Sequence, residues 1–175
     1  MRVKSVKYER LFSFEKYNNE RIGMEVEISE HDNAEAVLGE LYFKILNIEK
    51  CLDLFRYLKA KLDIIISSLK SLEKKRKDLL EDIRDTEKEL EEIQKIDDLL
   101  EKQRRICRLR EIKQLRRDLV EVEEKIENYE ELKQETKKAL EDLEQLIKAG
   151  EFEKALEKYL PLGEKLSEIY GYSYY

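Results

Sequence analysis

Residues 81–117, EDIRDTEKELEEIQKIDDLLEKQRRICRLREIKQLRR, decide the fold because an acidic block runs directly into a basic one. The first block, 81–96, carries seven acids, and the second, 102–117, carries eight Lys or Arg against the single acid Glu111. If the chain folds back near Leu99, the two blocks lie side by side and neutralise each other. The basic block therefore mainly indicates that the chain folds back on itself, although the same positive charge could also bind phosphate groups.

Two apolar seams accompany this charge reversal. Over residues 58–93, and again over 112–147, mostly apolar side chains recur at alternating spacings of four and three. The seam positions are Leu58, Leu62, Ile65, Leu69, Leu72, Arg76, Leu79, Ile83, Thr86, Leu90 and Ile93, and then Ile112, Leu115, Leu119, Val122, Ile126, Tyr129, Lys133, Thr136, Leu140, Leu143 and Ile147. This heptad spacing is typical of a left-handed coiled coil. The phase of the repeat breaks between the two seams, which predicts a turn near residues 95–99. We therefore expect an antiparallel coiled-coil arm over residues 58–147.

The charge pattern leaves one alternative open. Two unbroken helices that cross antiparallel in a homodimer, with their two-fold axis near Leu99, would pair the same blocks; the phase break favours the intramolecular hairpin. A parallel, in-register dimer would place like charges together and is disfavoured. Arg76 occupies a seam position, where an unpaired charge would be costly, so we expect it to reach Glu121 or Glu124 of the returning helix.

The N-terminal part of the sequence predicts a β-hairpin. Apolar and polar residues alternate in RIGMEVEIS (21–29), which indicates a half-buried strand, and VKYERLFSF (6–14) is its expected partner. A three-residue loop at 17–19 would pair Tyr8 with Ile28 and would turn the aromatic side chains to the apolar face.

A long helix should follow the hairpin. Asp32 and Glu35 have the spacing of a capping box, so the helix is expected to start near Asn33. The apolar positions of residues 34–57 are too broad for a single seam, which indicates contacts with the hairpin on one side and with other helices on another, and we expect the chain to oligomerise through this broad surface. The expected oligomer surface comprises Leu41, Tyr42, Ile45, Leu46, Leu52 and Phe55.

These patterns predict an α+β fold, mostly α, with an N-terminal β-hairpin packed on helices and a long antiparallel helical coiled-coil hairpin. The predicted base domain comprises residues 1–57 joined by 148–175, and the predicted arm comprises residues 58–147. Segment 148–175 reads as short helices separated by Pro161.

Composition narrows the class of protein. Charged residues make up 43% of the chain, against roughly 25% in an ordinary globular domain, and with one Pro and five Gly this favours long helices. Enrichment in Lys and Glu is also typical of the surface ion-pair networks of thermophiles. We find no apolar run long enough for a transmembrane helix and no apolar core of a signal peptide. Two cysteines are too few for a disulfide framework, so we expect a reduced, cytoplasmic protein.

The sequence offers no catalytic constellation. His31 is the only histidine and precedes a helix, which is typical of a solvated loop residue, and Cys107 has no neighbour at metal-ligand spacing. Glycine-rich phosphate-binding motifs are also missing from the sequence. We therefore expect no catalytic residue, metal ligand, cofactor or small-molecule substrate, and interpret the chain as a non-enzymatic coiled-coil assembly protein that forms homo-oligomers.

Nucleic-acid binding is the competing interpretation. Basic and aromatic residues interleave in the hairpin, a pattern that can stack single-stranded bases and hold phosphates. The candidate contact residues are Lys4, Lys7, Arg10, Lys16, Tyr17 and Arg21 in the hairpin and Arg104, Arg105 and Arg108 in the basic block.

A resemblance bears on this alternative. The stretch KYERLFSFEKYNNERIGMEVEIS (7–29) resembles the opening of small archaeal and phage proteins with the pattern K-Y-x-R-x-F, a loop containing Y-x-x-E, and then I-x-x-x-V-E. The matching residues here are Lys7, Tyr8, Arg10, Phe12, Tyr17, Glu20, Ile22, Val26 and Glu27. The resemblance implies a hairpin followed by a helix and a role in handling single-stranded DNA. It does not extend to the coiled-coil arm.

Overall fold

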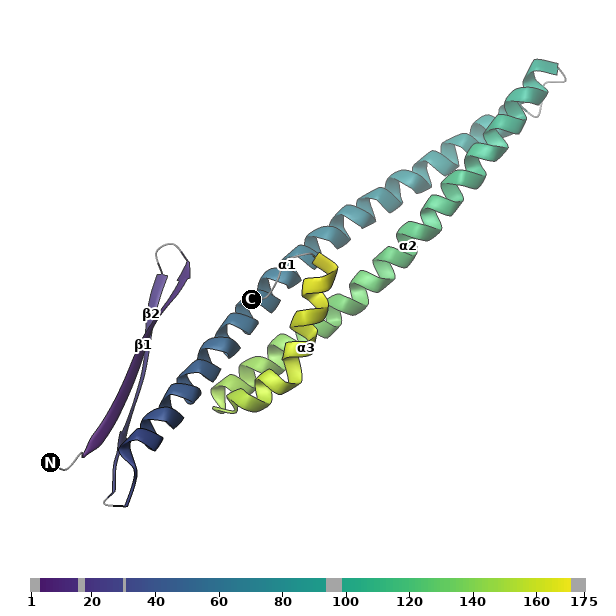
Figure 1. Cartoon of the computed structure of the whole chain (residues 1–175). Helices are drawn as coiled ribbons and strands as arrows, with labels where there is room; N and C mark the ends of the chain where they lie inside the picture. Colours follow the sequence, from purple (N-terminus) through teal and green to yellow (C-terminus); the bar gives the residue numbers. More distant parts are fainter. Residues whose placement is uncertain (1–3, 16–17, 30, 94–98, 171–175) are drawn as a thin grey trace. The chain divides into compact units, whose positions relative to one another are not determined.

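The chain folds into a two-stranded sheet followed by three helices (Figure 1). The computed structural model describes residues 4–15, 18–29, 31–93 and 99–170. Its elements are β1 (Ser5–Glu15), β2 (Asn18–Glu27), α1 (Ala34–Ile93), α2 (Leu99–Lys148) and α3 (Phe152–Tyr170). The hairpin packs on the helices, and α1 and α2 pack against each other. This architecture confirms the predicted α+β, mostly α fold class.

Two compact units make up the chain. The base unit comprises Met1–Lys61 and Lys138–Tyr175, and the arm unit comprises Leu62–Lys137. The sequence placed the corresponding boundaries after residues 57 and 147. Helices α1 and α2 each contribute to both units.

In the hairpin the strands pair in a different register from the predicted one. Tyr8 lies opposite Met24, so the predicted pairing of Tyr8 with Ile28 is wrong. The predicted loop at 17–19 is also wrong, because β2 already begins at Asn18 and the connection is shorter. The two registers differ by an even number of residues, so the same side chains share a face in both. Tyr8 therefore still lies on the face that packs on α1, where its ring meets Tyr42 edge-on at 5.6 Å.

The first helix begins close to the predicted residue but with a different cap. The side chain of Asn33 accepts a hydrogen bond from the backbone N–H of Glu35 at 3.0 Å, so Asn33 caps α1. Asp32, the predicted cap, instead accepts the backbone N–H of Ser29 at 2.8 Å. Asp32 and Asn33 both carry short side chains that can accept a hydrogen bond from the first turn, so the capping-box spacing alone could not show which of them caps the helix.

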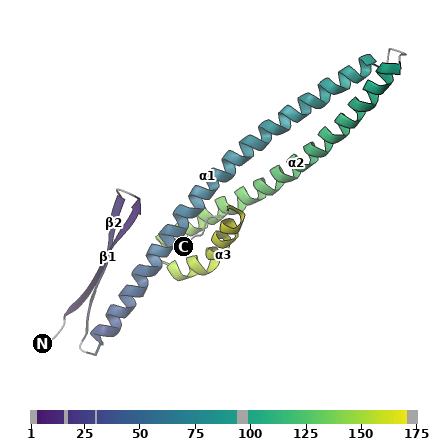
Figure 2. The same ribbon diagram turned by 45° about the horizontal axis from the view of Figure 1, so that its top comes forward.

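The arm unit is a helical hairpin built on the predicted seams. Figures 1 and 2 show α1 and α2 side by side in this unit. Every predicted seam position of the arm unit is buried or half-buried except Arg76. Two seam positions are threonines, and each hydroxyl donates within its own helix, Thr86 to the carbonyl of Asp82 (2.7 Å) and Thr136 to that of Leu132 (2.8 Å). The turn predicted near residues 95–99 falls on residues that lie outside the described ones except for Leu99, which opens α2.

Ion pairs between the two arm helices follow the predicted charge pattern. Arg108 contacts Glu89 at 2.7 Å and Arg116 contacts Glu87 at 2.8 Å, which joins the basic block to the acidic one. Arg76 pairs with Glu123 at 3.2 Å, so the expected partners Glu121 and Glu124 are wrong. The Arg76 side chain is 48% exposed, because its long stem carries the guanidinium out of the seam and into solvent.

Helix α2 ends in a glycine cap. Gly150 has a φ of 76°, and the backbone N–H groups of Gly150 and Glu151 donate to the carbonyls of Ile147 (3.1 Å) and Leu146 (2.9 Å). These two bonds form a Schellman motif, which needs a left-handed residue at this position. The following segment is one helix that contains Pro161, so the predicted division into short helices is wrong.

Packing against α1 and α2 holds α3 together across Pro161. The buried side chains of the base unit come from all three helices: Leu41, Ile45, Cys51, Leu54, Leu58, Ala139, Leu143, Ala155, Tyr159, Leu162 and Leu166. Near the end of α3, the ammonium of Lys61 lies 5.0 Å from the Tyr170 ring and 5.1 Å from the Tyr57 ring. Lys61 is only 4% exposed, and the aromatic faces stabilise its charge.

Two helix-interior glycines provide a test of the α1–α3 contact. A Cβ added at Gly163 would lie 2.9 Å from Cδ1 of the fully buried Leu54, whereas one added at Gly39 would meet nothing within 4 Å. Gly39→Ala should raise the free energy of unfolding by about 0.5–1 kcal/mol through helix propensity. Gly163→Ala should lower it by about 1 kcal/mol, because overpacking exceeds that gain. Urea unfolding followed by circular dichroism checks both, and equal gains would show that α3 does not approach α1 this closely.

Candidate functional site

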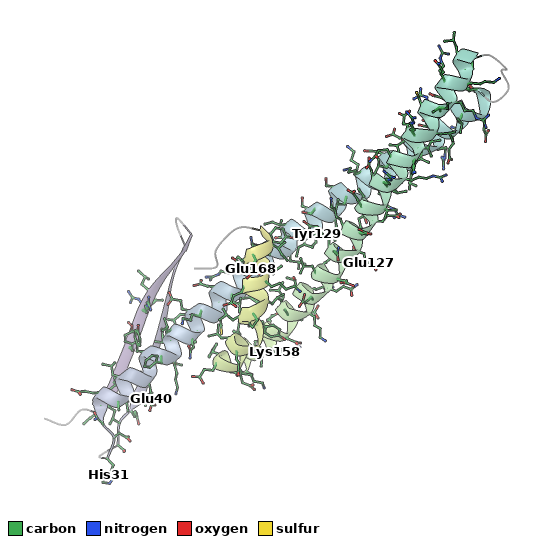
Figure 3. The ribbon with its side chains drawn as sticks, turned by 45° about the vertical axis from the view of Figure 1, so that its right-hand side comes forward. His31, Glu40, Glu127, Tyr129, Lys158 and Glu168 are labelled. Carbon is green, nitrogen blue, oxygen red and sulfur yellow. The ribbon has the colours of Figure 1, made fainter. Side chains whose placement is uncertain are left out.

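The described residues show no site built for metal or membrane chemistry. Within residues 4–15, 18–29, 31–93 and 99–170, no three His, Cys, Asp or Glu side chains gather as metal ligands would. No helix among these residues is both long and apolar enough to cross a bilayer. His31 is exposed in the turn before α1 (Figure 3).

Among the described residues, charged side chains line three open hollows on the surface. The hollow of the base unit, about 690 Å³, lies between Met24, Lys44 and the start of α3. Its polar groups pair locally, Asn47 donating to Glu153 at 3.3 Å and Lys154 contacting Glu151 at 2.6 Å. A hollow of about 710 Å³ in the arm unit contains Cys107, and the third, about 680 Å³, lies on α2.

The candidate nucleic-acid residues of the hairpin do not form one surface. Lys7 and Arg21 converge on Glu9, at 2.6 and 3.9 Å, on the face that points away from α1. Strand alternation puts Arg10 on the opposite face, where it pairs with Glu49 of α1 at 3.2 Å. Lys4 is exposed just before β1. Lys16 and Tyr17 lie outside the described residues.

In the arm, most of the candidate arginines are engaged by acids. Arg104 contacts Glu101 at 2.8 Å, and Arg108 contacts both Glu89 (2.7 Å) and Glu111 (2.6 Å). Arg105 is exposed and has no ion pair with another described residue. The basic block is therefore partly neutralised within the arm unit, as its charge pattern predicted.

The predicted oligomer surface of α1 divides into core and periphery. Leu41 and Ile45 are buried within the base unit, while Leu46, Leu52 and Phe55 are half-buried. Tyr42 is the member that reaches the surface. A broad apolar helix thus uses most of its width inside its own unit.

The sequence did not single out Phe43 and Leu38, which form an exposed patch with Tyr42. Phe43 is 62% exposed, and its ring lies 5.5 Å from that of Tyr42, edge to face. Tyr42 in turn meets Tyr8, so three aromatic rings run from the hairpin to the surface. We refer to Leu38, Tyr42 and Phe43 as the Phe43 patch. The one sequence feature that could have indicated this patch is that Phe43 is apolar and lies outside the heptad seams.

The two cysteines differ in chemistry. Cys51 is fully buried, and its thiol donates to the carbonyl of Phe152 at 3.2 Å, which ties α1 to the start of α3. Burial raises the pKa of the Cys51 thiol to about 11. Cys107 is exposed on the arm. Cys51 is therefore a core residue, and only Cys107 is open to reagents.

A polar contact joins α2 to α3 in the base unit. The hydroxyl of Tyr159 donates to Oδ2 of Asp142 at 2.6 Å, and the Lys158 ammonium donates to the same oxygen at 3.2 Å. These hydrogen bonds, with Tyr159 first, lower the pKa of Asp142. Lys158 and Tyr159 both come from α3, on which Figure 3 labels Lys158. The arrangement fixes the helix pair, since the carboxylate is satisfied by structural partners.

Comparisons of the chain with protein-family models, with curated proteins and with solved structures gave no match. Its class is therefore given by its fold: an α+β protein with a β-hairpin, a helical base unit and an antiparallel helical arm. The likeness of residues 7–29 to archaeal and phage proteins stays a prediction.

Thiol reactivity should distinguish the two cysteines. A disulfide reagent such as dithionitrobenzoate at about pH 8 should modify Cys107 rapidly and Cys51 only on unfolding, because the attacking species is the thiolate. Absorbance should report one fast thiol per native chain and two in denaturant. Cys107→Ser should remove the fast phase, and a fast phase that survives in this variant would show that Cys51 is open to solvent.

Stability at low pH should depend on Asp142. Its folded-state pKa is depressed, so its stabilising contribution is present above the usual pKa of 3.8 and is lost as pH falls through the folded value. The difference in free energy of unfolding between wild type and Asp142→Asn should therefore be largest near neutral pH and shrink below about pH 4. Urea titrations across this range measure it. Glu141→Gln, which alters the neighbouring exposed carboxylate, serves as the matched control, and a pH-independent difference would contradict the assignment.

Proposed function

We propose that this chain is a non-enzymatic assembly protein whose copies associate through the Phe43 patch of the base unit. The observation that carries the proposal is the exposure of Phe43 at the end of a row of three interacting aromatic rings. Aromatic residues are enriched at the cores of protein–protein interfaces, where they bury large area at little entropic cost. Contiguous exposed apolar groups of this kind mark interaction sites.

The surroundings of the patch suit a reversible contact. Glu40 and Lys44 flank it and are exposed, so a polar rim borders the aromatic centre, and Figure 3 labels Glu40 on α1. The Phe43 ring packs against Tyr42, and Tyr42 packs against Tyr8, which limits the rotamer entropy that Phe43 loses on association. A second copy of the same chain can present the same patch across a two-fold axis.

Nucleic-acid binding has less support from the geometry. A phosphate-binding surface needs cations that converge and aromatic faces that bases can reach. Lys7 and Arg21 converge on Glu9, and Arg10 pairs with Glu49 on the other face of the sheet. The charges of the hairpin therefore favour assembly over a role in holding single strands.

Substitution of Phe43 tests the proposal. Phe43→Glu should convert the oligomer into a smaller species in sedimentation equilibrium, because a carboxylate cannot be buried in an apolar contact. Its free energy of unfolding should change little, since the side chain is 62% exposed.

The matched control is Leu80→Glu, which alters an apolar residue of α1 that is 44% exposed but lies in the arm unit. This control should leave the oligomer unchanged. A wild-type chain that stays monomeric at high concentration, or an equal response to both substitutions, would overturn the proposal.

A further inference from the structure

A second surface lies on α2 in the arm unit, on a helical face outside the seam with α1. Its residues follow one another at spacings of three and four, so they share one face of the helix. We call this face the α2 stripe; its members are Ile106, Leu109, Lys113, Arg117, Val120, Glu124 and Glu127, and all are exposed. Ile106, Leu109 and Val120 are large apolar residues about half open to solvent, which the coiled-coil seam does not use.

The α2 stripe is divided by charge at Val120. On its N-terminal side lies the basic block 102–117, and on its C-terminal side segment 121–135 carries seven acids against Lys125 and Lys133. Several charged residues of the α2 stripe form no ion pair among the described residues. Lys113, Arg117, Glu124 and Glu127 are exposed and have no ion pair with another described residue.

From this division we infer that the α2 stripe binds the α2 stripe of a second copy of the chain, antiparallel, with the two-fold axis at Val120. In that register Lys113 of each copy faces Glu127 of the other, because the two residues are equally far from Val120 along the helix. Arg117, three residues before Val120, likewise lies near Glu124, four residues after it, of the other copy. The charged residues on either side of Val120 are therefore self-complementary, which is what a two-fold contact requires.

The local shape suits a helix as the occupant. A hollow of about 680 Å³ runs along this face and is lined by residues that include Leu109, Lys113, Arg117 and Val120. The aliphatic stem of Arg117 can cover Val120 of the partner, while the charged ends of Lys113 and Arg117 reach the partner's carboxylates. Figure 3 labels Glu127 on α2, in the acidic half that would receive Lys113.

Charge complementarity favours a second copy over nucleic acid. A phosphate backbone would be attracted to the basic half and repelled by Glu124 and Glu127 in the acidic half of the same stripe. A helix with the opposite order of charges fits both halves, and α2 itself, reversed, has that order. The inference extends the proposed assembly function to a second surface, in a different unit from the Phe43 patch.

Two complementary charge reversals test the pairing. The first variant is Lys113→Glu with Arg117→Glu, and the second is Glu124→Lys with Glu127→Lys. Each should fail to self-associate through the stripe, because like charges then meet at both ends of the contact. An equimolar mixture should associate, because each altered half then faces its complement. All chains carry Phe43→Glu, so that the Phe43 patch cannot contribute and the two proposals fail separately.

Sedimentation equilibrium at low salt measures the outcome. The dissociation constant should rise by on the order of tenfold or more in each variant alone and return toward the parent value in the mixture. It should also rise with salt, as surface ion pairs require. Unchanged association in either variant, or a mixture that stays dissociated, would overturn the inference. So would a parent chain that stays monomeric but binds a labelled single-stranded oligonucleotide, since the stripe would then serve nucleic acid.

A cysteine at the axis provides a second measurement that does not depend on charge. In a Cys107→Ser background, Val120→Cys should form an intermolecular disulfide under mild oxidation, because the two copies of residue 120 meet at the axis. Asn128→Cys places an exposed thiol on α2 outside the stripe and is the matched control. Equal cross-linking at both positions would show random collision and would contradict the two-fold contact.

Discussion

The antiparallel pairing of α1 with α2 depends on a seam whose charged flanks are complementary in one direction only. Apolar residues at heptad spacing supply most of the stabilisation, but a heptad seam alone accepts parallel and antiparallel partners. The ion pairs Arg108–Glu89, Arg116–Glu87 and Arg76–Glu123 select the hairpin, because each joins a residue before Leu99 to one after it, and the first and third pairs are nearly equidistant from Leu99. Each pair is exposed and contributes at most about 1 kcal/mol, so their effect is on specificity more than on stability.

In the base unit, packing must keep α3 helical across Pro161. Buried side chains of α3 pack on α1 and α2 on both sides of Pro161, and Gly163 allows α3 to approach Leu54. Lys61 is stabilised between Tyr57 and Tyr170, which joins the last turn of α3 to α1. Local propensity would end the helix at the proline, and tertiary packing overrides it.

Sequence reasoning succeeded where a pattern repeats and failed where a single residue decides. The seams and the helical hairpin follow from periodicity and charge blocks, and the structure bears them out. The predicted strand register and the predicted partner of Arg76 were wrong, because the length of a turn and the reach of a side chain cannot be read from sequence periodicity. The exposure of Phe43 was not predicted either, because it depends on how much of α1 the hairpin covers.

The two proposed surfaces would have different consequences for assembly. A single two-fold contact is closed, because each copy then uses its only surface on one partner. A chain with a second two-fold surface would keep one surface free after the first contact forms. Joining the Phe43 patch and the α2 stripe would then link copies beyond the dimer. The apolar contact would depend little on ionic strength, whereas the charged one would weaken in salt, so salt would set the size of the assembly.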